Sequence, residues 1–235
     1  MSYRVTQENI LSLRADAAAA SVTLSLELSE TPVCRAIADA GGDELRAAIR
    51  HRRLIPVGSA AEVDRGSLPF AHFFAVSAPV WLTGKANELL MLHRCYEKLF
   101  TLCEERDCHT LAMPFLSAEA YRFPREEAVK IAFAEAEGRS LEVIFVADTP
   151  ELYALSRQPY RKPRIVSYVG YYRDHALFEL DNGLFARVDL RPEIRDVTPI
   201  PYFEACYRTG NNPAQPPLPE EEIARLRRIY EENDW

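Results

Sequence analysis

Cysteine and histidine side chains gather in one short part of the chain, where they could act as metal ligands or as a nucleophile with its base. They are Cys95, Cys103, Cys108 and His109. The Cys-x-x-Cys pairing common in zinc sites is absent from the sequence. A catalytic pair of Cys108 and His109 is also disfavoured, because adjacent residues of a strand point to opposite faces. We therefore predict buried thiols, with no metal, no cofactor and no catalytic residue.

Two polar groups in the last third of the chain also have the residue types for chemistry. Asp174 and His175, with Glu179, resemble an acid–base group, but the place of Asp174 and His175 between two predicted strands favours a solvated turn. A basic run with an aromatic residue inside it could hold a phosphate or a nucleic-acid backbone. This run contains Arg157, Tyr160, Arg161, Lys162 and Arg164. We expect it to be a solvated linker.

The stretch best suited to position a ligand contains a helix, a buried strand, a loop and a second helix. Apolar residues at helical spacing over residues 88–100 predict the first helix, and a polar break over residues 104–107 ends it. An apolar run predicts a buried strand over residues 109–115, followed by a loop over residues 116–122. Pro124 suits the first position of the next helix. In an open α/β sheet, ligands bind in the loops after the carboxyl ends of strands, so we expect a site in this loop.

The rest of the first 155 residues alternates between strands and helices in the same way. Strands are predicted over residues 3–6, 18–27, 73–80 and 141–146. A helix in two pieces, interrupted at Gly41-Gly42, is predicted over residues 33–49. This alternation predicts an α/β fold with three layers, in which a central mixed sheet carries helices on both faces.

The last third of the chain differs in composition, because residues 156–235 hold 9 of the 16 prolines. Three short strands and an amphipathic helix are predicted there, over residues 165–172, 176–180, 184–190 and 220–232. Asp181-Asn182-Gly183 is a hairpin turn signal, and residues 192–219 are predicted to be irregular. We predict two domains: a body over residues 1–155, and an appendage of hairpin, proline-rich segment and helix over residues 156–235.

Length and composition limit the classes of protein. With 235 residues, 48% of them hydrophobic, the chain has ample material for a core. No apolar run approaches a membrane span, and no secretory signal is visible at the N-terminus. Five cysteines, an odd number, fit a reducing compartment. The net charge of −7 argues against a general nucleic-acid binder. We predict a cytoplasmic protein that binds neither membrane nor nucleic acid.

The segment TLAMPFLSAEAYRFP, residues 110–124, resembles the second phosphate loop of the macrodomain family, the ADP-ribose-binding modules. Six residues are identical in register: Ala112, Pro114, Ser117, Tyr121, Phe123 and Pro124. Residues 55–60, IPVGSA, resemble the family's Cys-Pro-Thr-Gly-Glu-Ala segment. The resemblance implies a macrodomain-like fold over residues 1–155, while no family is recognised in the last third.

The resemblance also implies where a ligand would bind. Residues 8–10 lie where the family has Gly-Asp-Ile, whose Asp meets the adenine amine. The phosphate loop would be residues 117–122. The implied ligand-binding residues are therefore Asn9, Ile10, Ser117, Ala118, Glu119, Ala120, Tyr121 and Arg122.

Three ligand-contacting motifs depart from the family pattern. Ala20 and Thr23 stand in place of two asparagines that position the distal ribose, and an alanine methyl cannot replace an amide. Residues 30–32, Glu-Thr-Pro, replace a run of glycines beside the diphosphate. In the phosphate loop, Glu119 replaces a glycine and adds a like charge, which Arg122 could offset.

Three functions remain open from the sequence. The chain could be a divergent module that binds ADP-ribose or a related nucleotide weakly and without catalysis. It could instead be an interaction or structural protein that keeps the fold without nucleotide binding, with a protein partner held by the C-terminal appendage. An ADP-ribosyl hydrolase is the least favoured class, because the ribose-facing asparagines are missing.

Overall fold

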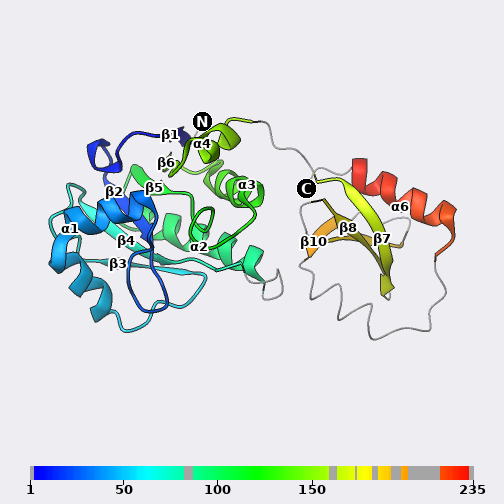
Figure 1. The fold of residues 1–235 in the computed structure, drawn as a ribbon, viewed down its shortest axis with the longest axis horizontal. Coiled ribbons are helices and arrows are strands. Elements are labelled where there is room, and N and C mark those ends of the chain that lie inside the picture. The colour runs from blue at the N-terminus through cyan, green and yellow to red at the C-terminus, as the bar shows by residue number, and fades with distance from the viewer. Residues whose placement is uncertain are drawn as a thin grey trace. The chain divides into compact units, whose positions relative to one another are not determined.

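The structure is a computed structural model that divides into two compact units, Met1–Trp81 with Glu88–Tyr160, and Leu82–Asn87 with Arg161–Trp235. Figure 1 shows both units as ribbons. The residues described are 3–81, 87–158, 163–172, 174–181, 185–191, 197–200 and 218–232.

The first unit is built on a six-stranded sheet with the order β1-β6-β5-β2-β4-β3. Its strands are β1 (Tyr3–Thr6), β2 (Ala17–Ser21), β3 (Ser59–Val63), β4 (His72–Ser77), β5 (Thr110–Pro114) and β6 (Glu142–Val146). Every neighbouring pair is parallel except β3 with β4, which is antiparallel. The predicted mixed sheet is therefore confirmed.

Helices cover both faces of this sheet (Figure 1). They are η1 (Ile10–Ser12), α1 (Pro32–His51), α2 (Glu88–Glu104), α3 (Arg125–Ala136) and α4 (Pro150–Ser156). Successive residues of a strand face opposite sides, and β2 shows this directly. Ala17 and Ala19 join the core under α2 and α3, whereas Ala18 and Ala20 join the core under α1. The predicted three-layer α/β/α arrangement is confirmed.

Several element boundaries differ from the sequence prediction. The strand predicted over residues 18–27 ends at Ser21, because Thr23–Glu27 forms a turn that is closed by a bridge between Val22 and Leu28. Pro124 occupies the N-cap of α3 and not its first helical position. Strand β3 and helix α4 were not predicted, since both are short and lack a clear apolar period.

The predicted interruption of α1 is confirmed. Gly42 lies inside this helix with φ 66° and ψ −162°, a conformation outside the helical region that glycine adopts without a steric cost. Gly41 packs so tightly that a Cβ there would lie 2.3 Å from a side-chain carbon of Leu45. The two glycines therefore allow α1 to bend while its apolar side stays on the core.

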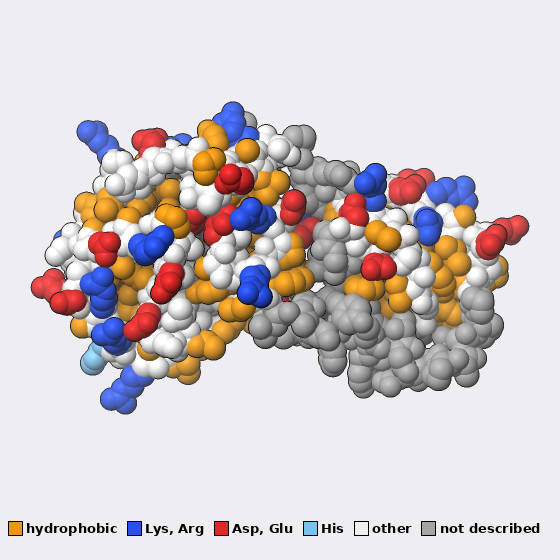
Figure 2. Space-filling model, in the orientation of Figure 1, with side chains coloured by type: hydrophobic (Ala, Val, Ile, Leu, Met, Phe, Trp, Pro, Cys, Tyr) orange, Lys and Arg blue, Asp and Glu red, His pale blue; other side chains and the backbone are white. Residues whose placement is uncertain are grey.

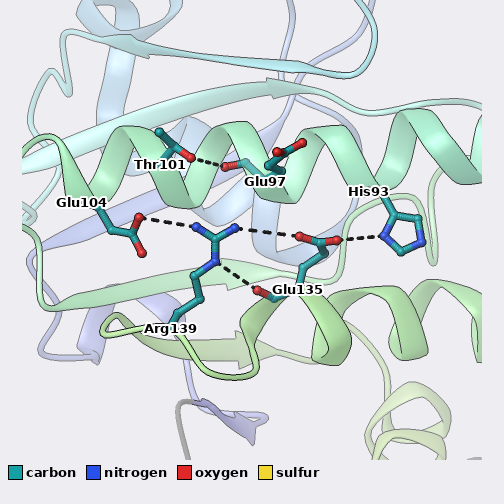
Figure 3. A network of polar contacts seen from close by, with 6 residues as sticks. All are labelled: His93, Glu97, Thr101, Glu104, Glu135 and Arg139. Carbon is teal, nitrogen blue, oxygen red and sulfur yellow. Dashed lines mark hydrogen bonds and ion pairs between the residues drawn. The ribbon is translucent and has the colours of Figure 1, made fainter.

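Helices α2 and α3 are joined by a polar network (Figure 3). The Glu135 carboxylate lies 2.9 Å from His93 Nδ1 and 3.9 Å from the Arg139 guanidinium. Arg139 also pairs with Glu104 at 3.4 Å and lies over the ring of Phe100. Because each group is only partly exposed, this network fixes the register of α3 against α2 more firmly than an isolated surface pair would.

The second unit contains a four-stranded antiparallel sheet with the order β10-β9-β8-β7 and the helix α6 (Glu220–Glu232). The strands are β7 (Ile165–Tyr172), β8 (His175–Leu180), β9 (Phe185–Asp189) and β10 (Val197–Ile200). The predicted hairpin and helix are confirmed. Strand β10 lies in a segment predicted to be irregular, so that prediction was wrong at these four positions. The turn residues 182–184, the segments 192–196 and 201–217, and Trp235 lie outside the described residues.

A buried carboxylate organises one end of this sheet. Asp189 is 1% exposed and accepts a hydrogen bond of 2.6 Å from the Arg191 guanidinium. This contact is the main reason that the pKa of Asp189 is lowered to about 2. Arg225 of α6 donates to the backbone carbonyl of Leu190 at 2.8 Å, so the helix is tied to the sheet beside this carboxylate.

The surface charge and the length of the helices are relevant to the predictions about nucleic acid and membranes. On the face shown in Figure 2, basic and acidic side chains of the first unit are interspersed. Among the described residues, no helix is both long and apolar enough to cross a bilayer.

A second carboxylate ties together the amino ends of three strands. Asp16 Oδ2 accepts hydrogen bonds from the His109 N–H at 2.8 Å, the Thr110 N–H at 2.9 Å and the Thr110 hydroxyl at 3.0 Å. The Asp16 carbonyl accepts from the backbone N–H groups of Ala71 and His72. The hydrogen bonds to the carboxylate, that from the His109 N–H first, lower the pKa of Asp16. The residue before β2 therefore fixes the starts of β4 and β5.

We predict that Asp16→Ala lowers the free energy of unfolding by about 2–3 kcal/mol, because three donors lose a charged acceptor. Urea unfolding measures this difference, and Asp43→Ala, which removes an exposed carboxylate, should change stability by less than about 0.5 kcal/mol. Since the folded pKa of Asp16 is lowered, its contribution is present above about pH 4 and fades below it. A deficit that does not shrink in acid would contradict this account.

Candidate functional site

The loops that carry the predicted site lie at one edge of the first unit's sheet. Strands β1, β6, β5, β2 and β4 run parallel to their neighbours, so their carboxyl ends meet there. Residues 7–13 follow β1, residues 115–124 follow β5, and residues 147–149 follow β6. Because β6 lies between β1 and β5, residues 147–149 come between the other two loops.

The loop over residues 115–124 is anchored by buried hydrogen bonds. The Leu116 N–H donates to the hydroxyl of Tyr96 at 3.0 Å, and the Ser117 hydroxyl donates to the Pro79 carbonyl at 2.7 Å. The Trp81 N–H donates to the Tyr121 carbonyl at 2.8 Å. The Ser117 side chain is therefore used inside the protein, and its φ of 62° sets the direction of the loop.

The remaining predicted residues of this loop differ in exposure. Ala118 is buried, whereas Ala120 and Arg122 are exposed. Glu119 pairs with Arg125 at 2.9 Å, and its other oxygen accepts from the Thr149 hydroxyl at 3.2 Å. The expected compensation of Glu119 by Arg122 was thus assigned to the wrong arginine. Arg125 starts α3 and reaches back over the loop.

The first predicted segment, Asn9 and Ile10, contributes less side chain than expected. Asn9 is the N-cap of η1, and its Oδ1 accepts from the Leu11 N–H at 3.0 Å. The Ile10 side chain is buried in the core under α1. Ile10 therefore leaves only its backbone for a ligand, while the exposed Asn9 is already engaged as a cap.

The two residues that replace the ribose-facing asparagines, Ala20 and Thr23, both have structural roles. Ala20 is fully buried in β2. Thr23 starts a turn in which its hydroxyl accepts from the Glu27 N–H at 3.3 Å and its own N–H donates to the Glu27 carbonyl at 2.7 Å. Neither position presents an amide to this edge of the sheet.

The N-terminus of α1 reaches the same edge, and a carboxylate caps it. Asp148, which follows β6, accepts a hydrogen bond of 2.9 Å from the Val33 N–H through Oδ1. Thr31 is the N-cap and accepts from the Cys34 N–H at 3.3 Å. Helix N-termini carry unpaired N–H groups and a partial positive charge, so a carboxylate is stabilised there. Asp148 could not be predicted as a site residue from the sequence, because its partner Val33 is 115 residues away.

Only one of the two carboxylate oxygens of Asp148 accepts a hydrogen bond in the described part of the chain. Oδ2 is buried and has no hydrogen-bond partner among the described residues. Burial raises the pKa of Asp148, the Val33 N–H and the Thr31 side chain oppose this effect, and the nearby charge of Glu119 adds a smaller increase. The carboxylate is therefore held at the helix end at some cost in solvation.

Tyr121 is the second side chain with an unsatisfied buried atom in this region. Its hydroxyl has no hydrogen-bond partner among the described residues. Burial raises the pKa of Tyr121, against a smaller opposite effect of the Ser29 hydroxyl. Ser29 itself donates to the Ser21 carbonyl at 3.0 Å and lies 3.5 Å from the Cys34 sulfur. The edge thus gathers hydroxyls, a buried thiol and two carboxylates.

The other groups from the sequence analysis form no second site in the part of the chain that the structure describes. Cys95, Cys103 and Cys108 are buried free thiols, and burial raises the pKa of each. No group of three metal-ligating side chains occurs among the described residues. His175 pairs with Asp189 at 3.4 Å and not with Glu179, which accepts from Ser167. In the basic run, residues 159–162 lie outside the description.

A hollow of about 950 Å³ lies elsewhere on the first unit. Its lining includes His51 and Arg52 at the end of α1, Glu62 of β3 and His72 at the amino end of β4. The hydrogen bond between His72 and Glu62 (2.8 Å) already uses two of these groups. None of the predicted site residues lines it.

Comparison with known proteins places the fold in a family. The Macro domain family model matches residues 18–132. O-acetyl-ADP-ribose deacetylase 1 of Pantoea vagans is 33% identical over 162 residues, which cover 63% of this chain and 94% of that protein. The chain belongs to the macrodomain family. A macro domain-containing protein of Mesorhizobium japonicum, mll7730, is 35% identical over 97 residues, and this match spans 41% of the chain and about half, 55%, of the relative's own length.

Solved structures agree with the macrodomain fold. The Oceanobacillus iheyensis macrodomain with ADP has a TM-score of 0.60 at 21% identity, covering 66% of this chain and 87% of that one. The Trypanosoma brucei macrodomain in complex with ADP-ribose has a TM-score of 0.58 at 17% identity, covering 66% and 67% respectively. The fold resemblance stated from the phosphate loop is therefore confirmed.

We predict that Tyr96→Phe lowers the free energy of unfolding by about 1–2 kcal/mol, because the buried Leu116 N–H loses its acceptor. Chemical denaturation measures the loss. Tyr153→Phe serves as the control, since the Tyr153 hydroxyl accepts only a 3.4 Å bond from exposed Arg157. Equal stability changes in the two variants would show that Tyr96 does not anchor the loop.

Proposed function

We propose that this macrodomain binds ADP-ribose or a related nucleotide only weakly and does not catalyse its hydrolysis. The observation that carries the proposal is the state of Ala20 and Thr23, where neither side chain offers an amide to the ligand edge. The proposed binding residues remain Asn9, Ile10 and the segment 117–122, with Ile10 and Ser117 acting only through their backbones.

The names of relatives support the ligand class. One solved neighbour is described in complex with ADP-ribose and another with ADP. A relative that aligns over most of its own length is named as an O-acetyl-ADP-ribose deacetylase. We take the ligand class from these proteins and not the activity, because hydrolysis requires a water to be oriented against the distal ribose and this chain lacks the amides for that task.

The expected loss of binding free energy can be estimated from the hydrogen-bonding groups that this chain lacks. Three hydrogen-bonding elements are lost, namely the two amides and the glycine run, at roughly 1–1.5 kcal/mol each. Their sum of about 4 kcal/mol separates micromolar from millimolar affinity. Charge adds to this loss, because the Glu119 and Asp148 carboxylates lie close enough for Glu119 to raise the pKa of Asp148, and both would repel a diphosphate bound at this edge.

We expect titration calorimetry to give a dissociation constant for ADP-ribose in the millimolar range, about a thousandfold weaker than micromolar. Glu119→Gly should bind more tightly, since the substitution removes a side chain and a charge from the loop. Glu119→Gln is the matched control that removes the charge alone. Micromolar binding by the unmodified protein would overturn the proposal.

We also expect no turnover of a mono-ADP-ribosylated protein or of O-acetyl-ADP-ribose above the rate in buffer. The reason is again the missing amides, which no neighbouring side chain replaces among Ser21, Val22 and Thr23. Release of ADP-ribose followed by liquid chromatography measures turnover. Hydrolysis that depends on protein concentration would refute this prediction.

A protein-binding role is the second candidate, and a feature of the second unit favours it. Strand β7 lies at the end of the sheet order, with Val166 58% and Val169 41% exposed. An exposed edge strand with apolar side chains can pair with a strand of a partner. If neither the unmodified protein nor Glu119→Gly binds nucleotide, this candidate replaces the first.

A further inference from the structure

Every backbone N–H group in the first turn of α1 donates a hydrogen bond within the protein. Pro32 has no N–H, the Val33 N–H donates to Asp148, and the Cys34 N–H donates to the Thr31 side chain. The Arg35 N–H donates to the Thr31 carbonyl at 2.9 Å. The donors that make a helix N-terminus an anion site are therefore all used by the protein itself.

We propose that Asp148 is a specificity-determining residue at this edge of the sheet, whose carboxylate occupies the anion position at the N-terminus of α1 and thereby excludes phosphate groups of a ligand. The inference rests on the proposed function, since it concerns the same sheet edge. It adds to the charge repulsion the direct occupation of the helix N–H by the carboxylate.

The geometry favours Asp148 over the other acidic groups for this role. Glu119 is paired with Arg125 and accepts from Thr149, so its charge is partly compensated. Asp148 has no ion pair among the described residues, and its charge is stabilised only by groups at the start of α1, namely the Val33 N–H and the Thr31 side chain. A phosphate arriving at Val33 would have to displace this carboxylate and then lie beside it, as well as beside Glu119.

The unsatisfied atoms indicate which ligand group this edge of the sheet would accept instead. Among the described residues, Asp148 Oδ2 is a buried acceptor without a hydrogen-bond partner, and the Tyr121 hydroxyl is likewise unpaired. An acceptor in this position suits a neutral ligand group that donates a hydrogen bond, such as a sugar hydroxyl. The site should therefore discriminate between ligands by the charge of the group placed beside Asp148.

The test uses inorganic pyrophosphate as the probe, because it has the diphosphate and lacks the nucleoside. In Asp148→Ala, which frees the Val33 N–H and removes the charge, titration calorimetry should show binding at least about tenfold tighter than in the unmodified protein. Asp148→Asn removes the charge and keeps an oxygen for the Val33 N–H, so it should show a smaller gain. Glu151→Gln, which removes an exposed carboxylate three residues along the chain, should show none.

The outcomes separate this inference from the proposed function. Pyrophosphate binding by both Asp148 variants that equals that of the unmodified protein would overturn the inference, whatever Glu119→Gly does with ADP-ribose. A gain for pyrophosphate in the Asp148 variants, with no ADP-ribose binding by either the unmodified protein or Glu119→Gly, would support the role of Asp148 and overturn the nucleotide-binding function. If Asp148→Ala does not fold, Asp148→Asn decides, with a shift of the Val33 amide resonance on adding pyrophosphate as the second readout; no shift would overturn the inference.

Discussion

Strand β2 is buried on both faces, and the first unit depends on that constraint. Four consecutive alanines, residues 17–20, have no exposed surface, and they divide alternately between the core under α1 and the core under α2 and α3. Small side chains allow both helical layers to approach the sheet closely. Asp16 adds the polar part of the same arrangement, because it fixes the neighbouring strands where β2 begins.

This constraint limits what the other end of β2 can carry. Ala20 belongs to the core under α1, where an asparagine would need hydrogen-bond partners that an apolar environment does not supply. The chain then turns at Thr23–Glu27 and returns to Thr31, where α1 is capped. The tight packing of β2 thus also determines which polar side chains its carboxyl end can present at the edge of the sheet.

Local patterns predicted most of the fold. The apolar spacing of residues 88–100 and the buried runs of β5 and β6 predicted the helix and strands around the loop, and Gly41-Gly42 predicted the bend in α1. Short elements without a period, such as β3 and α4, could not be predicted this way. Contacts between distant residues were also inaccessible, because the partners Val33–Asp148 and Glu119–Arg125 depend on how loops meet at the sheet edge. The sequence therefore predicted which loop residues belong to the site. It did not predict the hydrogen bonds and ion pairs that these residues form with other parts of the protein.

The capped N-terminus of α1 has a consequence for how the protein responds to its surroundings. A protein whose ligand completes an open helix end becomes more stable as the ligand concentration rises, by RT ln(1 + [L]/Kd). Here the carboxylate of Asp148 supplies that completion within the chain, at an effective concentration that never changes. The thermal stability of the folded protein should therefore depend only weakly on the concentration of nucleotide, changing by about 0.4 kcal/mol when a ligand reaches its dissociation constant.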